Sequence, residues 1–400
     1  MPAIRILTAV PICDGHDSAI NTINLEFIRH GIEVIYLGYN RSAKEMARAA
    51  LQEDVVAIGI STYNGGHIEF FEEVVDRLHK LRLAPIIKIF GGGGGTITRE
   101  DAAIMYGRGV DRIFFAGTPL TEMLAYVRAG YSEVEQRPYD TSFAGTDQFL
   151  ARQLTLAERG AGTLPKAPEE AHGGAKPRRN SKVIGLTGPG GAGKTTLIDE
   201  LVYRFLRSYP ENQRVAILSH DPSLVGSGAL LGDRATMIYS QHDRVFMRSL
   251  ATRGQAGGVS PSTGRCLEIL VKSALFEVIL VETVGTGQEA IPFGIETLAV
   301  DKAVLVMPPD YGSRLQLQKI AMIDAADAIV VNKSDLHGSR TAVAEIEYRI
   351  RTNQKGQTLL RTQATRHGDT GVDQLFALLF DGKRGSHESE AAHAAGAREA

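Results

Sequence analysis

The chain has 400 residues, 44 basic and 46 acidic side chains and a formal net charge of −2 at pH 7, and this length predicts two domains or three small ones. The balanced charge gives no electrostatic reason to expect nucleic acid or an anionic membrane as the main partner. Two cysteines are too few for a disulfide framework or a cysteine-based metal site, and neither a leader pattern nor a membrane-spanning apolar stretch is evident. We therefore expect a cytoplasmic protein that binds neither nucleic acid nor membrane.

Short apolar runs alternate with amphipathic stretches through the first part of the chain. The expected strands cover residues 4–10, 33–38, 55–61, 86–91 and 112–116, and the expected helices cover 19–30, 43–52, 67–81, 99–106 and 120–129. A series of this kind predicts a doubly wound parallel sheet over residues 1–137, an α/β domain. Ligands bind such sheets beyond the carboxyl ends of the strands.

Three unusual segments lie at those strand ends. The sequence CDGHD (13–17) follows the first strand, STYNGGH (61–67) ends the third, and five consecutive glycines (91–95) follow the fourth. A histidine beside two aspartates is by itself an ordinary surface loop. Five glycines at a neighbouring strand end, however, indicate that a bulky ligand approaches the backbone closely at this edge.

These residues resemble the flavodoxin-like cobalamin-binding fold of coenzyme B12-dependent acyl-CoA mutases, whose pattern is Asp-x-His-x-x-Gly, Ser-x-Leu and Gly-Gly. Ala19 and Tyr63 stand where this pattern has Gly and Leu. Neutral imidazole is a competent metal ligand, and a carboxylate that accepts the other ring N–H fixes its tautomer. The resemblance implies adenosylcobalamin as cofactor and His16 as its lower cobalt ligand, with further cofactor contacts from Asp14, Ser61, Gly91, Gly92 and Gly93.

Residues 138–181 are expected to form a linker that contains one helix, 147–158. The stretch 159–182 is rich in Gly, Ala, Pro, Glu and Arg and has no apolar period, which predicts a flexible connection and two domains that move relative to each other. Its end, KPRRNSK, suits either a solvated linker or a small anion-binding patch. Residues 383–400 have no apolar anchors and are expected to form a disordered tail.

A phosphate-binding motif opens the second domain, 182–382. GPGGAGKT (188–195) has two glycines flanking four residues, then Lys and Thr, and it lies between an apolar strand and an apolar-faced helix, as this motif requires. The loop N–H groups and the helix N-terminus bind phosphate, while Lys194 bridges the terminal phosphates and Thr195 offers its hydroxyl to Mg²⁺. The expected nucleotide contacts are Gly188, Gly190, Gly191, Ala192, Gly193, Lys194, Thr195 and Thr196.

Three acidic residues are candidate partners of Mg²⁺. Asp221 follows the strand 214–219, Asp233 lies in a Gly-rich stretch, and Glu282 begins the turn ETVG after the strand 278–281. Such a turn senses the terminal phosphate and the metal in P-loop proteins. Asp221 and Asp233 also suit solvated loops or helix caps. The candidate catalytic residues are Lys194, Thr195, Glu282 and Gly285; the next residue, Thr286, is no water-orienting Gln, so we expect slow hydrolysis until a partner docks.

The tetrapeptide Asn332-Lys333-Ser334-Asp335 follows an apolar strand, 328–331, and fits the pattern Asn-Lys-x-Asp. A carboxylate at the last position accepts hydrogen bonds from N1–H and the exocyclic amine of guanine, whereas adenine would leave it without donors. The sequence therefore predicts GTP and GDP as the nucleotides. Gln363 and Ala364 are candidates for a further loop at the base.

The segments LLGDRATM, FMRSLATRG and ETVGTGQ resemble the MeaB-type chaperone GTPases of B12-dependent mutases, which share a SIMIBI-like P-loop fold with metal-insertion GTPases. Both domains in this order resemble the front part of the fused isobutyryl-CoA mutases, with close local agreement in CDGHD, LGYNRS, ALQEDV, GGHIEFF and FGGGGG. Those proteins continue into a barrel that binds the acyl-CoA, and we expect this chain to lack such a barrel.

The resemblance implies that the chain supplies a B12 domain and a GTPase chaperone to a separate large acyl-CoA mutase subunit, of the isobutyryl-CoA or methylmalonyl-CoA type. GTP hydrolysis would gate loading and protection of the cofactor. The resemblance also implies a homodimer and an adenosyltransferase as a further partner.

Other classes of function remain open. A cobalamin carrier without a mutase would show the same motifs. A P-loop kinase would share Lys194 and Thr195 but has no need of Asn332 and Asp335. A nickel-insertion GTPase would require a Cys or His cluster, and a flavin-binding redox domain would leave His16 without a role.

Overall fold

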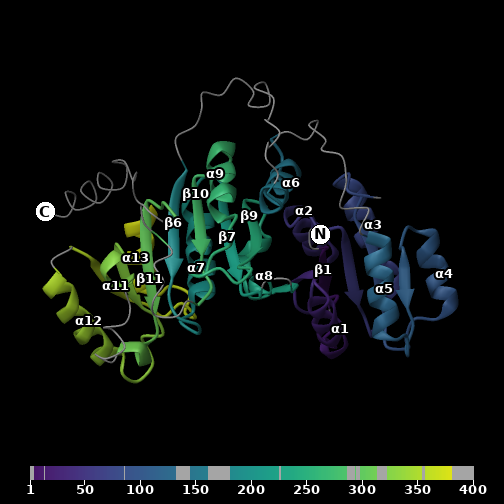
Figure 1. Ribbon diagram of the computed structural model, residues 1–400, viewed down its shortest axis with the longest axis horizontal. Coiled ribbons are helices and arrows are strands. Elements are labelled where there is room, and N and C mark those ends of the chain that lie inside the picture. The colour runs from purple at the N-terminus through teal and green to yellow at the C-terminus, as the bar shows by residue number, and fades with distance from the viewer. Residues whose placement is uncertain are drawn as a thin grey trace, which may run out of the picture.

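The structure, a computed structural model, describes residues 4–12, 14–84, 86–131, 145–160, 181–224, 227–285, 293, 298–312, 322–353 and 356–380. It contains two parallel sheets flanked by helices, which lie side by side along the long axis of the molecule (Figure 1). The expected fold class, two doubly wound α/β domains, is confirmed. None of the helices in these residues combines the length and the apolar character that crossing a membrane requires.

The N-terminal sheet has the strand order β5-β4-β3-β1-β2-β8. Helices α2, α3 and α4 pack on one face and α1 and α5 on the other. The bounds are β1 Arg5–Ala9, α1 Ser18–Arg29, β2 Glu33–Tyr36, α2 Ala43–Gln52, β3 Ala57–Ser61, α3 His67–Lys80, β4 Lys88–Gly92, α4 Arg99–Gly107, β5 Arg112–Phe114 and α5 Leu120–Tyr131. All ten elements were expected, and most of their ends lie within one or two residues of the predicted ends.

The second sheet has the order β13-β12-β11-β6-β10-β7-β9. Helices α6, α9, α11 and α12 contribute to the core on one face, and α7 and α13 on the other. The bounds are α6 Asp147–Glu158, β6 Lys182–Thr187, α7 Lys194–Ser208, β7 Val215–Asp221, β8 Ala229–Leu231, α8 Asp233–Thr236, β9 Val245–Ala251, α9 Thr263–Ser273, β10 Val278–Glu282, β11 Lys302–Met307, α11 Met322–Ala325, β12 Ala328–Val331, α12 Ser339–Asn353, β13 Thr358–Arg361 and α13 Thr370–Phe380.

The sixth strand of the N-terminal sheet comes from the second half of the chain. Strand β8 runs parallel to β2, with Glu33 opposite Ala229 and Ile35 opposite Leu231. Just before β8, the Gly228 N–H donates to the carbonyl of Ile28, in α1, at 2.9 Å. The sequence predicts no strand at 229–231 and no sheet shared between the domains. Strand β8 satisfies the backbone groups that β2, as an edge strand, would leave unpaired.

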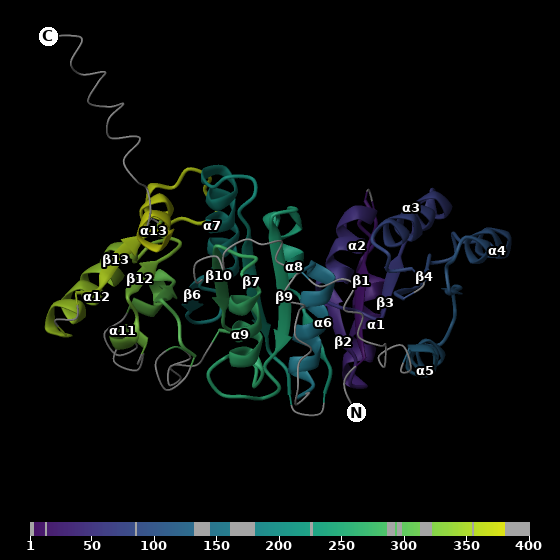
Figure 2. The same ribbon diagram turned by 90° about the horizontal axis from the view of Figure 1, so that it is seen from above.

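Helix α6 has the predicted bounds, but it is packed into the molecule. Leu150, Ala151 and Leu154 belong to the core of the second sheet, and α6 contacts both α2 and α9. Figure 2 shows α6, β9 and α8 between β7 and β1. The predicted flexible stretch lies for the most part outside the described residues, as does the predicted tail.

Buried ion pairs join the two sheets. Arg234, with 0% of its side chain exposed, bonds Glu53 at 3.1 Å, and the Ser249 N–H and hydroxyl also donate to Glu53. Arg5 pairs with Glu158 at 2.9 Å. Because removing one member would leave a buried charge uncompensated, replacing a single partner should weaken the packing of β1 and α2 against β9 and α6.

Candidate functional site

The loop after β1 is tied to the loop after β3 through one buried carboxylate. Asp14 accepts hydrogen bonds from the backbone N–H of Tyr63 at 2.6 Å, Asn64 at 3.2 Å and His16 at 3.0 Å. Burial opposes ionisation of this carboxyl, but the N–H donors outweigh it and lower the pKa of Asp14 below its ordinary value. The carboxylate therefore remains an anion at neutral pH.

His16 lies against this anion. Its Nδ1 is 2.9 Å from Asp14 Oδ1, and 62% of its side chain is exposed. Because an ionised carboxylate can only accept, Nδ1 carries a proton, and in the neutral form of the ring Nε2 then has the lone pair. The Tyr63 ring lies beside the imidazole, with centroids 4.7 Å apart. The pair fits a cobalt ion bound by imidazole, because an exposed histidine ring is oriented by a carboxylate at its other nitrogen.

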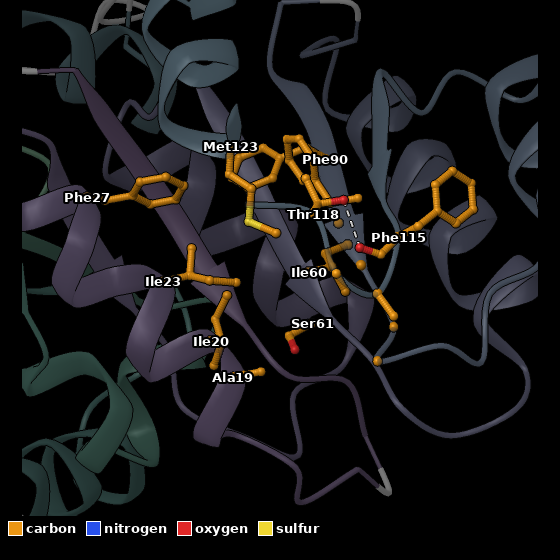
Figure 3. A pocket seen from close by; sticks show the side chains of 17 residues that line it. Ala19, Ile20, Ile23, Phe27, Ile60, Ser61, Phe90, Phe115, Thr118 and Met123 are labelled. Carbon is orange, nitrogen blue, oxygen red and sulfur yellow. Dashed lines mark hydrogen bonds between the residues drawn. The ribbon is translucent and has the colours of Figure 1, made fainter. Parts of the chain in front are cut away.

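A cavity of about 180 Å³ opens at the same edge of the sheet. Ser61 and the glycines from Gly91 to Gly94 line it together with apolar side chains of α1, β3, β4 and α5 (Figure 3). The structure gives a packing reason for two of these glycines that the sequence does not reveal. A Cβ on Gly91 would lie 2.5 Å from the Ile60 carbonyl oxygen, and a Cβ on Gly92 would lie 2.8 Å from the Phe114 carbonyl oxygen. The close packing of β4 against its neighbours requires them.

The phosphate loop, between β6 and α7, is held in a conformation that only glycine tolerates. Gly188 has φ +146°, and a Cβ there would lie 1.9 Å from the Val306 carbonyl oxygen. Gly193, with φ +82°, precedes α7, whereas Gly190, Gly191 and Thr196 are exposed. The loop packs closely against the turn after β10. A Cβ on Gly285, in that turn, would lie only 2.4 Å from the Gly190 nitrogen.

Lys194 lies buried under this loop. Its Nζ donates to the carbonyl oxygens of Gly188 at 3.0 Å and Pro189 at 3.2 Å. Burial lowers the pKa of Lys194, although the carboxylates of Glu282 and Asp233 oppose that shift. The ammonium is therefore placed where it can exchange carbonyl oxygens for phosphate oxygens.

Glu282 is hydrogen-bonded to the last residue of the phosphate-loop motif. Its Oε1 accepts the hydroxyl of Thr195 at 2.7 Å, and its Oε2 is buried without a hydrogen-bond partner among the described residues. Asp233 accepts the hydroxyl of Ser219, and Asp221 Oδ2 accepts the Gly232 N–H at 3.1 Å. No group of three or more His, Cys, Asp or Glu side chains in the described part of the chain is already assembled around a metal position.

These carboxyls nevertheless interact electrostatically. Burial, followed by the neighbouring charge of Asp233, raises the pKa of Glu282 to about 8. Burial and the charges of Asp233 and Glu282 likewise raise the pKa of Asp221. Mg²⁺ prefers oxygen ligands and neighbouring carboxylates. The Thr195 hydroxyl, the unpartnered oxygen of Glu282 and the nearby aspartates provide such ligands, so these residues fit the ion.

The raised pKa values predict a pH-dependent stability. The folded chain holds protons on Glu282 that the unfolded chain has lost, so this contribution to stability is present below about pH 4.5 and is lost as the pH rises through about 8. In EDTA we expect the melting temperature to fall from pH 6 to pH 8.5, and Mg²⁺ with GDP to reverse much of that fall. The variant Glu282→Gln should show a weaker pH dependence; an unchanged decline would assign it to other groups.

Asn332 connects the phosphate loop with the candidate base loops. Its Nδ2 donates to the Ala192 carbonyl at 2.9 Å, and its Oδ1 accepts the Thr362 hydroxyl at 3.0 Å and the Ala364 N–H at 3.1 Å. Lys333 has a positive φ of 55°, and Asp335 is exposed. The structure thus brings the segments around Asn332, Gln363 and Ala364 together and leaves the Asp335 carboxylate accessible to a base.

Exchanging the Asp335 carboxylate for an amide should change the base preference. In Asp335→Asn the amide N–H₂ is itself a donor and cannot accept a hydrogen bond from the donor groups of guanine. The 2-oxo group of xanthine, by contrast, can accept a hydrogen bond from this amide. A lost bidentate pair costs about 1–3 kcal/mol, roughly 5- to 150-fold in affinity. We expect GDP affinity to fall by this factor while XDP affinity rises, measured by fluorescent-nucleotide titration. Retained GDP preference would mean that the base is read elsewhere.

Two buried residues near the nucleotide site, His220 and Thr263, are not identified by the sequence analysis. His220 lies directly before Asp221 and bonds both the Glu282 carbonyl and the Thr263 hydroxyl. Burial lowers the pKa of His220 to about 4, so the ring is neutral at pH 7. A polar residue at an inward position of an apolar strand is the one sequence signal for His220. Thr263 has none, because its role depends on a strand 43 positions away.

A P-loop with Lys194 and Thr195, an acidic residue at the next strand end and an Asn-Lys-x-Asp loop define a GTPase-type nucleotide site, here joined to a flavodoxin-like domain. Residues 150–394 match the family described as methylmalonyl Co-A mutase-associated GTPase MeaB, and residues 4–124 match the B12 binding domain. The chain belongs to the MeaB family and carries a B12-binding domain in front of its GTPase domain.

Curated relatives combine the same two parts. The fused isobutyryl-CoA mutase of Cupriavidus metallidurans is 36% identical over 396 residues, which cover 94% of this chain and 35% of that protein. That of Geobacillus kaustophilus is 37% identical over 404 residues, covering 94% and 36%. The chain thus spans just over a third of the length of these relatives. Among solved structures, HypB from Helicobacter pylori in complex with nickel covers 51% of this chain at 13% identity and a TM-score of 0.38.

Proposed function

We propose that this chain is the cofactor-binding and chaperone part of an adenosylcobalamin-dependent acyl-CoA mutase, and that it acts in the cytoplasm. The B12-binding domain would hold the cofactor, and the GTPase domain would hydrolyse GTP to gate cofactor loading and protection. The proposal is supported by membership of the MeaB family, by the B12-binding domain and by the two fused relatives, whose names describe isobutyryl-CoA mutases.

In the B12-binding domain, His16 would be the lower ligand of cobalt through Nε2, and Asp14 would keep Nδ1 protonated and the ring in place. The cavity with Ser61 and the glycines of β4 would receive the displaced nucleotide tail. Adenosylcobalamin supplies radical chemistry when it is bound. Asp14, His16 and Ser61 of this chain would orient the cofactor.

In the GTPase domain, Lys194 would neutralise the β- and γ-phosphates, and Thr195 and Glu282 would hold Mg²⁺, with Asp221 and Asp233 close by. Gly285 would report the γ-phosphate through its contact with Gly190. Asp335 would accept hydrogen bonds from guanine. Attack of water on the γ-phosphorus would break its bond to the β-phosphate oxygen, releasing GDP and phosphate.

The observation that carries the coupling is strand β8. Asp221 and Asp233, both at the nucleotide site, flank strand β8, and β8 pairs with β2 of the cobalamin-domain sheet. Arg41, just after β2, donates to the Ala235 carbonyl at 2.7 Å, and Arg234 is bonded to Glu53. A rearrangement of Asp233 on GTP binding would therefore displace backbone that is bonded to the B12-binding domain.

The acyl-CoA would be bound by another part of the mutase. The residues described by the structure form two open sheets, and a substrate enclosed away from water needs a closed site. We propose that a separate large subunit supplies it, that this chain forms a homodimer, and that an adenosyltransferase delivers the cofactor.

An affinity purification tests the proposed partner. The tagged chain, loaded with adenosylcobalamin and a non-hydrolysable GTP analogue, is recovered from its native lysate, and the bound proteins are identified by mass spectrometry. Recovery of a large mutase subunit, together with acyl-CoA isomerisation by the recovered complex, is the expected result. If cobalamin-transfer proteins are recovered and no isomerisation is detected, the chain is instead a cobalamin carrier.

A further inference from the structure

His220 occupies a position in the nucleotide site to which neither the motifs nor the proposed reaction assigns a role. It lies near the end of β7 and is 2% exposed. Its Nδ1 is 2.6 Å from the backbone oxygen of Glu282, and its Nε2 is 2.8 Å from the hydroxyl of Thr263, the first residue of α9. One imidazole ring therefore bridges the acidic turn and the start of a helix.

The partners of the ring fix its tautomer. A backbone carbonyl can only accept, so Nδ1 carries the proton. In the neutral ring Nε2 then has a lone pair and accepts the proton of the Thr263 hydroxyl. The Thr263 hydroxyl also donates to the Ser260 carbonyl oxygen at 2.7 Å, so its one proton is shared between this oxygen and Nε2 at 2.8 Å.

A second contact connects the same two segments. The Val284 N–H donates to the Gly258 carbonyl at 2.9 Å. The turn that begins at Glu282 is therefore fastened to residues 258–263 at two points, one on each side of Thr283. These bonds fix the backbone of Glu282, whose carboxylate holds Thr195 at 2.7 Å and keeps one oxygen unpartnered.

We infer that His220 is a positioning residue for the Mg²⁺ site: with Thr263 it holds the Glu282 carboxylate in the orientation that binds the ion of Mg²⁺·GTP. The inference rests on the proposed function, because it takes Glu282 to be a metal-binding residue. His220 would not touch nucleotide or metal itself. Removing an outer hydrogen-bond partner of a metal-binding residue costs about 10- to 100-fold in metal affinity or activity.

Thr263 offers a conservative pair of variants. Thr263→Val keeps the shape of the side chain but removes the hydroxyl, so Nε2 loses its donor; Thr263→Ser keeps the hydroxyl and serves as the matched control. For both we would measure Mg²⁺ binding to the GDP-bound protein by calorimetry, the Mg²⁺ dependence of GTP hydrolysis, and GDP affinity in EDTA.

We expect Thr263→Val to weaken Mg²⁺ binding by about tenfold or more, with GDP affinity in EDTA unchanged, and Thr263→Ser to match the wild type. Equal Mg²⁺ affinity in Thr263→Val and wild type would overturn the inference while leaving the GTPase proposal intact. A wild-type chain that binds no Mg²⁺·GTP would overturn the GTPase proposal, and the inference with it.

A measurement on the unaltered protein keeps the inference testable if Thr263→Val fails to fold. Nitrogen NMR of the ¹⁵N-histidine-labelled chain distinguishes the two ring tautomers. We expect His220 as the Nδ1–H tautomer at neutral pH. An Nε2–H tautomer would show that the ring does not donate to Glu282 and would contradict the proposed role.

Discussion

Replacing Lys194 with alanine is expected to lower the rate of GTP hydrolysis by about 10²-fold or more, the usual cost of removing one group that stabilises transition-state charge. Lys194 is the basic side chain buried beneath the phosphate loop, where it donates to Gly188 and Pro189. In the variant the charge that develops on the transferred phosphoryl group is not neutralised. Phosphate release measured with saturating GTP and Mg²⁺ gives this rate.

Burial lowers the pKa of Lys194, which means that the folded state disfavours the charged ammonium. Loss of this ammonium should therefore not unfold the protein. Lys302→Ala is the matched control, since Lys302 is partly exposed and pairs with Asp327 at the amino end of β11. If Lys194→Ala and Lys302→Ala both hydrolyse GTP at the wild-type rate, the proposed role of Lys194 and the P-loop in hydrolysis is wrong.

Replacing His16 with alanine is expected to abolish the spectrum of cobalamin bound through a protein histidine. Nε2 of His16 is the nitrogen left available by the bond of Nδ1 to Asp14, and alanine offers no ligand. The absorption spectrum of the bound cofactor should change to that of a form without imidazole from the protein, and affinity should fall. Titration with cobalamin, followed optically, measures both.

Two further variants sharpen this test. His79→Ala, on the exposed side of α3, should leave the spectrum unchanged. Asp14→Asn keeps the shape of the side chain but loses the anion that orients His16, so affinity should fall by about 10- to 100-fold while cobalt remains bound by histidine. A histidine-ligated spectrum that persists in His16→Ala would assign the ligand elsewhere.

The repeating units of the fold follow from the sequence because local patterns determine them. Helices 43–52 and 147–158 have the predicted bounds, since apolar periodicity specifies both ends of the buried stripe. Strand β9 could not be predicted in this way: Arg248 and Ser249 interrupt its apolar pattern. Their buried partners, Glu158 and Glu53, come from other parts of the chain.

Some residues of the candidate site could be predicted from local sequence patterns and others could not. Lys194, Asn332 and Asp335 are recognisable because phosphate and guanine require fixed residue types at fixed spacing. Strand β8, which links the two domains, has three residues, and its partner strand β2 comes from a distant part of the chain. His220 and Glu53 act through partners 43 and 181 positions away, so a single sequence contains no local pattern for them.

The central claim, that the nucleotide site and the cobalamin domain are coupled through β8, is tested most directly by one linkage measurement. The dissociation constant of adenosylcobalamin is determined by titration with the chain bound to Mg²⁺·GDP and again with a non-hydrolysable Mg²⁺·GTP analogue. We predict values that differ by about 5- to 150-fold, the usual range of coupling between two sites. Identical values in the two nucleotide states would contradict the account.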